Sequence, residues 1–165
     1  MTEILAAEAF IQKYSREGHV LLDVRSEKEF AQAHVPGAVN IPLLNDDHRR
    51  QVGITYKSNG REAAVLKGFD LVGDKFSGFI RQVKRLTSEK HVMLYCWRGG
   101  MRSSIMAWVL GMGGFKIFLL RGGYKSYRNF VFQKLEEPRR VVVVGGKTGS
   151  GKTEVLSELR KTVGQ

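Results

Sequence analysis

One cysteine stands at the end of an apolar run and is followed at once by glycines and arginines. It lies in the segment CWRGGMRS (96–103), and Cys96 is the only cysteine among the 165 residues. Backbone amides in a glycine-rich loop can turn toward the sulfur, and a helix that begins near Arg102 adds partial positive charge. Arg98 and Arg102 add full charges. These features favour the thiolate, so the segment predicts a reactive cysteine rather than a structural one.

A second segment, VVVVGGKTGSGKT (141–153), has the spacing of a Walker A phosphate loop. It follows an apolar run and opens an expected helix, the context in which backbone amides cradle phosphate. In such a loop the lysine neutralises phosphates and the threonine holds magnesium. The predicted phosphate-binding residues are Gly146, Gly149, Gly151, Lys152 and Thr153. Only 12 residues follow Thr153, which leaves no place for a Walker B aspartate. We therefore expect phosphate or nucleotide binding without competent hydrolysis.

Alternating apolar and amphipathic stretches must position these two segments. Strands are predicted over 20–24, 38–41, 91–96, 115–120 and 139–144. Helices are predicted over 4–17, 26–32, 101–114, 124–137 and 153–163, and a mostly polar helical stretch over 43–88 with breaks at Gly53, Gly60, Gly68 and Gly73. Ser26 and Glu29 have capping-box spacing. This alternation predicts an α/β domain with a mainly parallel sheet flanked by helices.

Pro138 marks the expected domain boundary. We predict a first domain over 1–137 and a second over 138–165. The second holds one strand, one glycine-rich loop and one helix, which is too little chain to bury its own core. The sequence therefore predicts a truncated P-loop β-loop-α unit after a first, larger domain.

Charge is distributed unevenly along the chain. Residues 1–45 carry 4 basic and 6 acidic groups, whereas residues 46–165 carry 23 basic and 10 acidic groups, a net charge of +13. A soluble basic protein and a nucleic-acid-binding protein both fit this balance. The chain has no signal-peptide pattern and no apolar run near the ~18 residues of a membrane span. With a lone cysteine, these features favour the cytoplasm and no membrane partner.

The four histidines show no metal-ligand spacing, so no metal site is expected. His34 stands beside a Val-Pro-Gly turn and is interpreted as structural. Asp23 and Arg25 leave the first strand and are expected to form a buried ion pair rather than to act in catalysis. Trp97 lies beside the cysteine and could stack on a base.

The segment LLDVRSEKEFAQAHVPGAVNIP (21–42) resembles the signature of the rhodanese domain, and LLRGGYKSY (119–127) resembles the closing motif of that fold. The signature residues in register are Asp23, Arg25, Glu29, His34, Pro36, Gly37 and Asn40. The resemblance covers residues 1 to about 130. It implies that Cys96 carries a chalcogen atom as a persulfide or selenylsulfide, and that Arg102 and the loop amides bind the oxyanion of the donor. The implied substrate-binding residues are Trp97, Arg98, Gly99, Gly100 and Met101.

The loop after the cysteine departs from the ordinary rhodanese pattern. Five residues separate Cys96 from Arg102, whereas sulfur-transferring rhodaneses have four. The longer loop resembles rhodanese-fold phosphatases and implies a wider cradle, which suits a phosphate-bearing donor better than thiosulfate.

A rhodanese domain followed by a P-loop, with CWRGGMRS between them, resembles the bacterial tRNA 2-selenouridine synthase family. The resemblance implies replacement of the sulfur of wobble 2-thiouridine by selenium, through a geranylated base and an S-selanylcysteine. Selenophosphate and geranyl diphosphate would be co-substrates, no cofactor would be required for the rhodanese step, and tRNA and the enzyme that supplies selenophosphate would be partners. Members of this family are longer, so the chain is interpreted as truncated. The alternatives are a rhodanese-fold sulfurtransferase, a phosphatase that uses the same cysteine, and a non-catalytic binding module.

Overall fold

The computed structural model describes residues 2–138 and 142–163. The chain divides into two compact units, the first ending at Leu135 and the second beginning at Glu136. Within the described residues, no helix is both long enough and apolar enough to cross a membrane.

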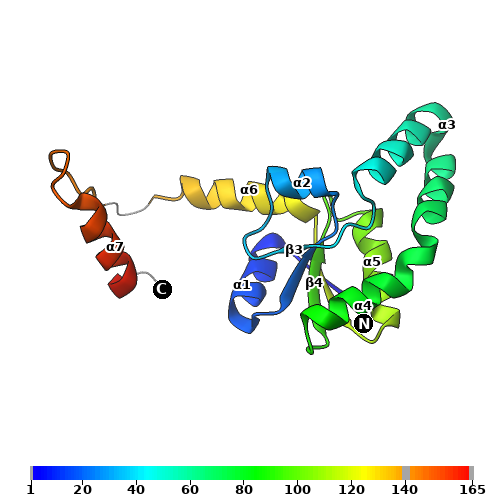
Figure 1. Cartoon of the computed structure of the whole chain (residues 1–165), viewed down its shortest axis with the longest axis horizontal. Coiled ribbons are helices and arrows are strands. Elements are labelled where there is room, and N and C mark those ends of the chain that lie inside the picture. The colour runs from blue at the N-terminus through cyan, green and yellow to red at the C-terminus, as the bar shows by residue number, and fades with distance from the viewer. Residues whose placement is uncertain (1, 139–141, 164–165) are drawn as a thin grey trace. The chain divides into compact units, whose positions relative to one another are not determined.

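The first unit is built on a five-stranded sheet in which every strand pairing is parallel (Figure 1). The strands are β1 (Thr2–Leu5), β2 (Val20–Asp23), β3 (Val39–Asn40), β4 (His91–Tyr95) and β5 (Lys116–Leu120). Their order across the sheet is β1-β5-β4-β2-β3. The predicted α/β class with a parallel sheet is confirmed.

Helices cover both faces of the sheet. They are α1 (Ala7–Glu17), α2 (Glu27–Gln32), α3 (Asp46–Val72), the 3-10 turn η1 (Gly73–Lys75), α4 (Phe76–Leu86), α5 (Met101–Met112) and α6 (Gly123–Glu136). Alternate strand residues point to opposite faces. Met93 and Phe118 pack with Phe10 of α1 and Tyr124 of α6. The opposite face of the sheet packs against α4 and α5. The central strands β4 and β5 are therefore mostly apolar, because both of their faces are buried.

The N-terminal segment differs from its prediction. Residues 4–17 were expected to form one helix, but Thr2–Leu5 is the edge strand β1, and α1 begins only at Ala7. Ile4 pairs with Leu119 of β5. Apolar residues at intervals of three or four predict a helical face, but this local pattern does not show that the first residues will pair with the edge of a sheet. Backbone pairing with β5 therefore replaced that turn.

The polar stretch after β3 is helical as predicted, but only some of its glycines are breaks. Gly60 has φ +82° and divides α3 into two arms, and Gly73 begins η1. Gly53 and Gly68 remain inside α3, where a single glycine costs only about 1 kcal/mol relative to alanine. The predicted breaks at these two positions are wrong.

The second unit contains α7 (Lys152–Val163) after a glycine-rich loop. The strand predicted over 139–144 is absent from its described part, residues 142–144. Residues 139–141 lie outside the described part of the chain, and residues 142–144 have no regular secondary structure. The Val142 and Val143 side chains are exposed. A strand needs a hydrogen-bonding neighbour, and no other strand is present among the described residues of this unit.

Candidate active site

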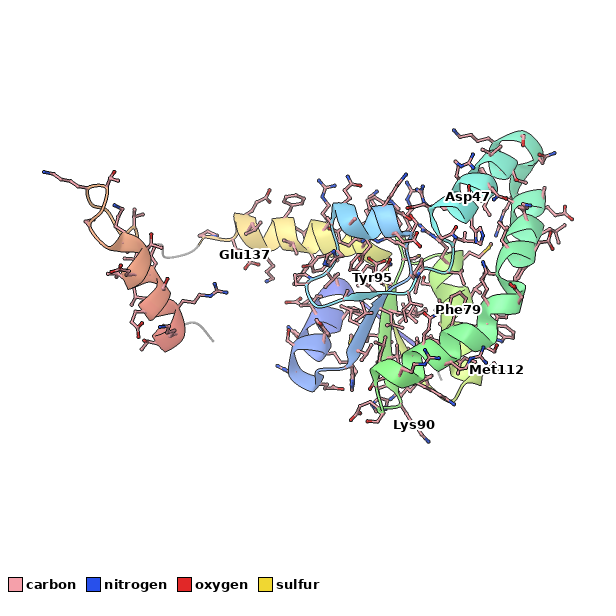
Figure 2. The ribbon with its side chains drawn as sticks, in the orientation of Figure 1. Asp47, Phe79, Lys90, Tyr95, Met112 and Glu137 are labelled. Atoms are coloured by element: carbon pink, nitrogen blue, oxygen red, sulfur yellow. The ribbon has the colours of Figure 1, made fainter. Side chains whose placement is uncertain are left out.

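Cys96 lies at the carboxyl edge of the sheet, directly after Tyr95, the last residue of β4 (labelled in Figure 2). Ligands of open α/β sheets bind at this edge. The Cys96 side chain is 3% exposed, and its Sγ lies 3.2 Å from Oγ of Ser103 and 3.9 Å from the carbonyl oxygen of Gly100. Gly100 is the N-cap of α5. The sulfur therefore sits beside the N-terminus of α5.

Ser103 is the residue beside the sulfur that sequence reasoning did not assign to the site. Its hydroxyl donates to the Gly100 carbonyl oxygen at 2.9 Å and is almost fully buried. It can accept a hydrogen bond from the thiol, or rotate and donate one to the thiolate. The available signal was its place in the first turn of the expected helix, where side chains point back toward the N-terminus.

Two glycines lock the cysteine loop against the start of α6. Gly99 has φ +66°, and a Cβ there would come within 2.9 Å of the Gly122 nitrogen. A Cβ on Gly123 would overlap the carbonyl oxygen of Cys96. The amides of Tyr124 and Lys125 donate to the carbonyl oxygens of Cys96 (2.8 Å) and Trp97 (3.0 Å). The closing motif therefore acts on the site by fixing the loop that carries the sulfur.

A pocket of about 290 Å³ opens beside the sulfur. It is lined by Cys96, Trp97, Arg98, Gly100, Met101 and Arg102. The structure thus brings five of the six predicted loop residues together around Cys96. Gly99 is the exception, because it faces the Gly122–Gly123 turn and does not line the pocket.

Arg102 lines the pocket and forms an ion pair with the carboxylate of Glu29. Its Nη1 and Nη2 donate to the two carboxylate oxygens of Glu29 at 2.7 and 3.3 Å. Arg49 also contacts this carboxylate, with Nε 3.0 Å from Oε2. Burial raises the pKa of Glu29, but the hydrogen bonds and charge of Arg102 outweigh burial and hold that pKa below its usual range. Glu29 therefore orients the guanidinium and offsets part of its charge.

The pocket brings two arginines beside a cysteine, an arrangement that suits an anionic ligand. Residues 6–130 match the family described as "Rhodanese-like domain". The chain belongs to this family. Its rhodanese-like domain resembles the solved N-terminal domain of a putative ATP/GTP binding protein from Clostridium difficile 630, with a TM-score of 0.71 and 35% identity. That likeness covers 78% of this chain and 98% of the other.

Two curated relatives carry the same name. The chain is 42% identical over 152 residues to a protein of Sulfurovum sp. (strain NBC37-1), which covers 87% of this chain and 41% of the relative. It is also 42% identical over 149 residues to a protein of Bdellovibrio bacteriovorus, and this match covers 85% of this chain and 38% of the relative. Both relatives are named tRNA 2-selenouridine synthase. The chain therefore spans about two fifths of the length of the curated relatives it matches.

Other signature residues of the rhodanese-like domain stabilise the segment that follows β2. Arg25 Nη2 lies 2.6 Å from Asp23 Oδ2, and both side chains are at most 1% exposed, so the predicted buried ion pair is confirmed. Asn40 donates to the carbonyl oxygens of Asp23 and Arg25. The His34 ring stacks on Phe30 with centroids 3.9 Å apart, which fits its structural interpretation. Asp23, Arg25 and Asn40 therefore stabilise the turn between β2 and α2, the helix that carries Glu29. Ser26 and Glu29 form the predicted capping box at the start of α2.

Outside the rhodanese-like domain, the predicted phosphate-binding residues form a compact loop. Gly146, Gly149 and Gly151 have positive φ angles. The Lys152 amine donates to the carbonyl oxygens of Gly146 (2.9 Å) and Lys147 (2.7 Å). Thr153 lies in the first turn of α7. The Lys152 amine therefore closes the loop through two of its own carbonyl oxygens.

The fold also brings together one group of possible metal ligands that sequence spacing could not reveal. The parallel register pairs Val20 with Val92 and so places His19 beside His91. Ligand atoms of His19, Glu89 and His91 lie within 4.8 Å of one another. This group lies at the amino edge of the sheet, away from Cys96. His19 also accepts or donates a hydrogen bond at 2.6 Å with Glu17 and stacks on Phe118, contacts that explain its place without an ion.

Proposed function

We propose that this chain carries the selenium-transfer site of an enzyme that converts 2-thiouridine at the wobble position of tRNA into 2-selenouridine. The observation that carries the proposal is the only thiol of the chain, buried at a helix start in a pocket lined by Arg98 and Arg102. The names of the relatives supply the nucleoside. The basic surface expected from the sequence suits tRNA, and the soluble, cytoplasmic setting of tRNA modification follows from the same proposal.

In the first step, the Cys96 thiolate attacks the selenium of selenophosphate. The S–Se bond forms and the Se–P bond breaks, and its electron pair leaves with phosphorus as phosphite. Sulfur and selenium are oxidised and phosphorus is reduced. Arg102, with Arg98 beside it, stabilises the negative charge on the departing group. The product is an S-selanylcysteine at Cys96.

In the second step, the terminal selenium attacks carbon 2 of the S-geranylated base, and the C2–S bond breaks to release geranyl thiolate. A small thiol then attacks the Cys96 sulfur, and the S–Se electron pair leaves with the selenouridine. A second thiol reduces the mixed disulfide and restores Cys96. Geranyl diphosphate is the proposed co-substrate of the earlier geranylation, and the loop around Lys152 is the proposed phosphate- or nucleotide-binding element.

The longer loop after Cys96 favours one rival reaction. Attack on phosphorus instead of selenium would leave phosphocysteine and release selenide, as in a phosphatase. Phosphoryl and selenium adducts have nearly the same mass, so adduct mass alone does not separate the two reactions.

The test is incubation of the chain with selenium-77-labelled selenophosphate, followed by peptide mass spectrometry and elemental analysis. We expect labelled selenium on the Cys96 peptide, and labelled 2-selenouridine after addition of an anticodon stem-loop with S-geranyl-2-thiouridine and a small thiol. Phosphorus on Cys96 without selenium, together with release of phosphate from aryl phosphates, would contradict the proposal and favour the phosphatase.

A further inference from the structure

A groove much larger than the pocket at Cys96 runs beside it. It has a volume of about 1060 Å³ and shares Arg98, Met101 and Arg102 with the cysteine pocket. This volume lies at the upper end of the range of small-molecule sites. The groove is therefore continuous with the site of the reaction, but it is too large for a phosphate-sized donor alone.

The two arms of α3 build the groove. Figure 1 shows α3 bending sharply between its cyan and green halves, and the bend is at Gly60. From the first arm, the lining residues are Arg49, Val52, Gly53, Tyr56 and Lys57. From the second arm they are Arg61, Ala64, Val65, Gly68, Phe69 and Val72. Each set repeats at intervals of three and four residues, so each arm presents one helical face to the groove.

The lining is apolar with a basic rim. Its floor is buried and includes Leu43, Leu44, Ala64 and Val72, while Tyr56 and Phe69 are 59% and 45% exposed. The charged residues that line it are all basic: Arg49, Lys57, Arg61, Arg98 and Arg102. Exposed aromatic side chains along a concave apolar surface are typical of a ligand site. Glu29 pairs with Arg49 and Arg102 but not with the other three basic lining residues, so the rim keeps an excess of positive charge that favours a ligand with phosphate.

We infer that this groove binds the apolar chain on the sulfur of the modified base, while the basic rim holds neighbouring phosphates of the RNA. The inference rests on the proposed function and adds a binding site for the leaving group. Carbon 2 must come within bonding distance of the selenium on Cys96, so a chain attached to that carbon through sulfur must begin in the cysteine pocket. The apolar surface that borders this pocket is the groove, because Met101 belongs to both.

The size of the chain should determine affinity. Burying a methylene group improves binding by roughly fourfold. A geranyl group carries nine more carbons than a methyl group, so even partial burial predicts a preference on the order of 100-fold for the geranylated base. A groove that only attracts RNA phosphates would bind the two bases equally.

The experiment measures binding of two anticodon stem-loops to the full chain by fluorescence anisotropy. One carries S-geranyl-2-thiouridine at the wobble position, and the other carries S-methyl-2-thiouridine. The variants Tyr56→Asp and Phe69→Asp place a carboxylate in the groove. Their matched controls are Ile54→Asp and Leu66→Asp, which put the same charge on the same two arms at residues that do not line the groove and are 55% and 61% exposed.

We expect the parent chain and both controls to keep the ~100-fold geranyl preference, and both groove variants to lose most of it while binding of the methyl probe stays within about twofold of its matched control. Equal binding of the two probes to the parent chain, no binding of either, or equal losses in groove variants and controls would overturn the inference. Selenium loading of Cys96, measured on the same samples, separates this outcome from the proposed function. Loading without geranyl preference removes only the groove assignment, and preference without loading removes only the transfer reaction.

Discussion

The cysteine loop and the Walker A loop are both glycine-rich turns that precede a helix, but they are supported very differently. The loop around Cys96 starts from a buried strand with neighbours on both sides, and the amides of α6 hold two of its carbonyl groups. The loop around Lys152 follows exposed valines that lie in no strand, and its lysine bonds to the loop's own carbonyl oxygens. Similar loop sequences therefore give a preorganised pocket in one case and a self-closed turn in the other. The difference lies in the source of support: strands and α6 hold the cysteine loop, whereas the contacts of Lys152 come from its own loop.

The largest expected effect is the loss of the sulfur. Cys96→Ser should abolish selenium loading, because a hydroxyl is barely ionised near neutral pH and the chain has no second cysteine to carry selenium. Elemental analysis of the protein after incubation with selenophosphate measures the outcome. Ser104→Ala, on the exposed side of the same helix turn, serves as the control and should load normally. Selenium that remains bound to Cys96→Ser would show that another residue is the carrier.

Removal of the pocket arginine should have the next largest effect. Arg102→Ala should slow loading by roughly 10²–10³-fold, the cost of losing one donor to a developing oxyanion. Arg102→Lys should recover only part of this rate, since a point charge lacks the planar fork that matches both Glu29 and phosphate oxygens. Rapid-quench measurement of Cys96 loading tests both variants. Arg50→Ala, which removes an exposed arginine paired with Asp47, should change the rate by less than about twofold. An equal rate for Arg102→Ala and Arg50→Ala would remove Arg102 from the reaction.

The carboxylate that holds Arg102 should make the first unit sensitive to acid. The pKa of Glu29 is lowered in the folded protein, so its contribution to the free energy of unfolding is complete above the ordinary carboxyl pKa near 4.3 and is lost as the pH falls through the lowered value. Glu29→Gln should therefore lower that free energy by about 2 kcal/mol at pH 7, and the difference from the parent should shrink below about pH 4. Urea unfolding at several pH values measures it. The exposed Glu62→Gln is the control, and a difference that does not change with pH would contradict the role of the ion pair.

Salt should reveal how the two units share tRNA binding. The basic groups beyond residue 45 predict an affinity that falls about tenfold or more between 50 and 200 mM salt. Arg61→Ala, at the rim of the groove, should reduce the slope of log affinity against log salt by about one. Arg160→Ala on α7 should leave the slope unchanged if the first unit provides the binding surface. Affinity that is independent of salt would be inconsistent with electrostatic binding.

The smallest effect should come from the Walker A lysine. Lys152→Ala should leave Cys96 loading unchanged, and the parent chain should show negligible ATP or GTP turnover, because the lysine amine is already occupied by loop carbonyl oxygens. Coupled phosphate-release assays and the loading assay cover both expectations. Steady nucleotide turnover that Lys152→Ala abolishes would show that the second loop is as well organised as the first.

Sequence reasoning succeeded where the signal was local or where the resemblance carried it. The position of Cys96 after a strand, the helix start near Arg102 and the Asp23–Arg25 pair could all be read from neighbouring residues. It failed where distant segments decide the outcome. β1 forms because β5 offers an edge, and Gly99 leaves the pocket because Gly123 packs against it. The contact between Glu29 and Arg102 joins residues 73 positions apart, which no local pattern encodes.

The lone thiol has a further consequence for handling and for oxidative stress. Two copies of the chain can be joined by a disulfide only through Cys96 itself, so every such link would remove two reaction centres at once. Its near-complete burial protects against this loss. For the same reason, a thiol reagent that reaches this sulfur would block selenium loading at the same time, so modification and loss of loading should rise together.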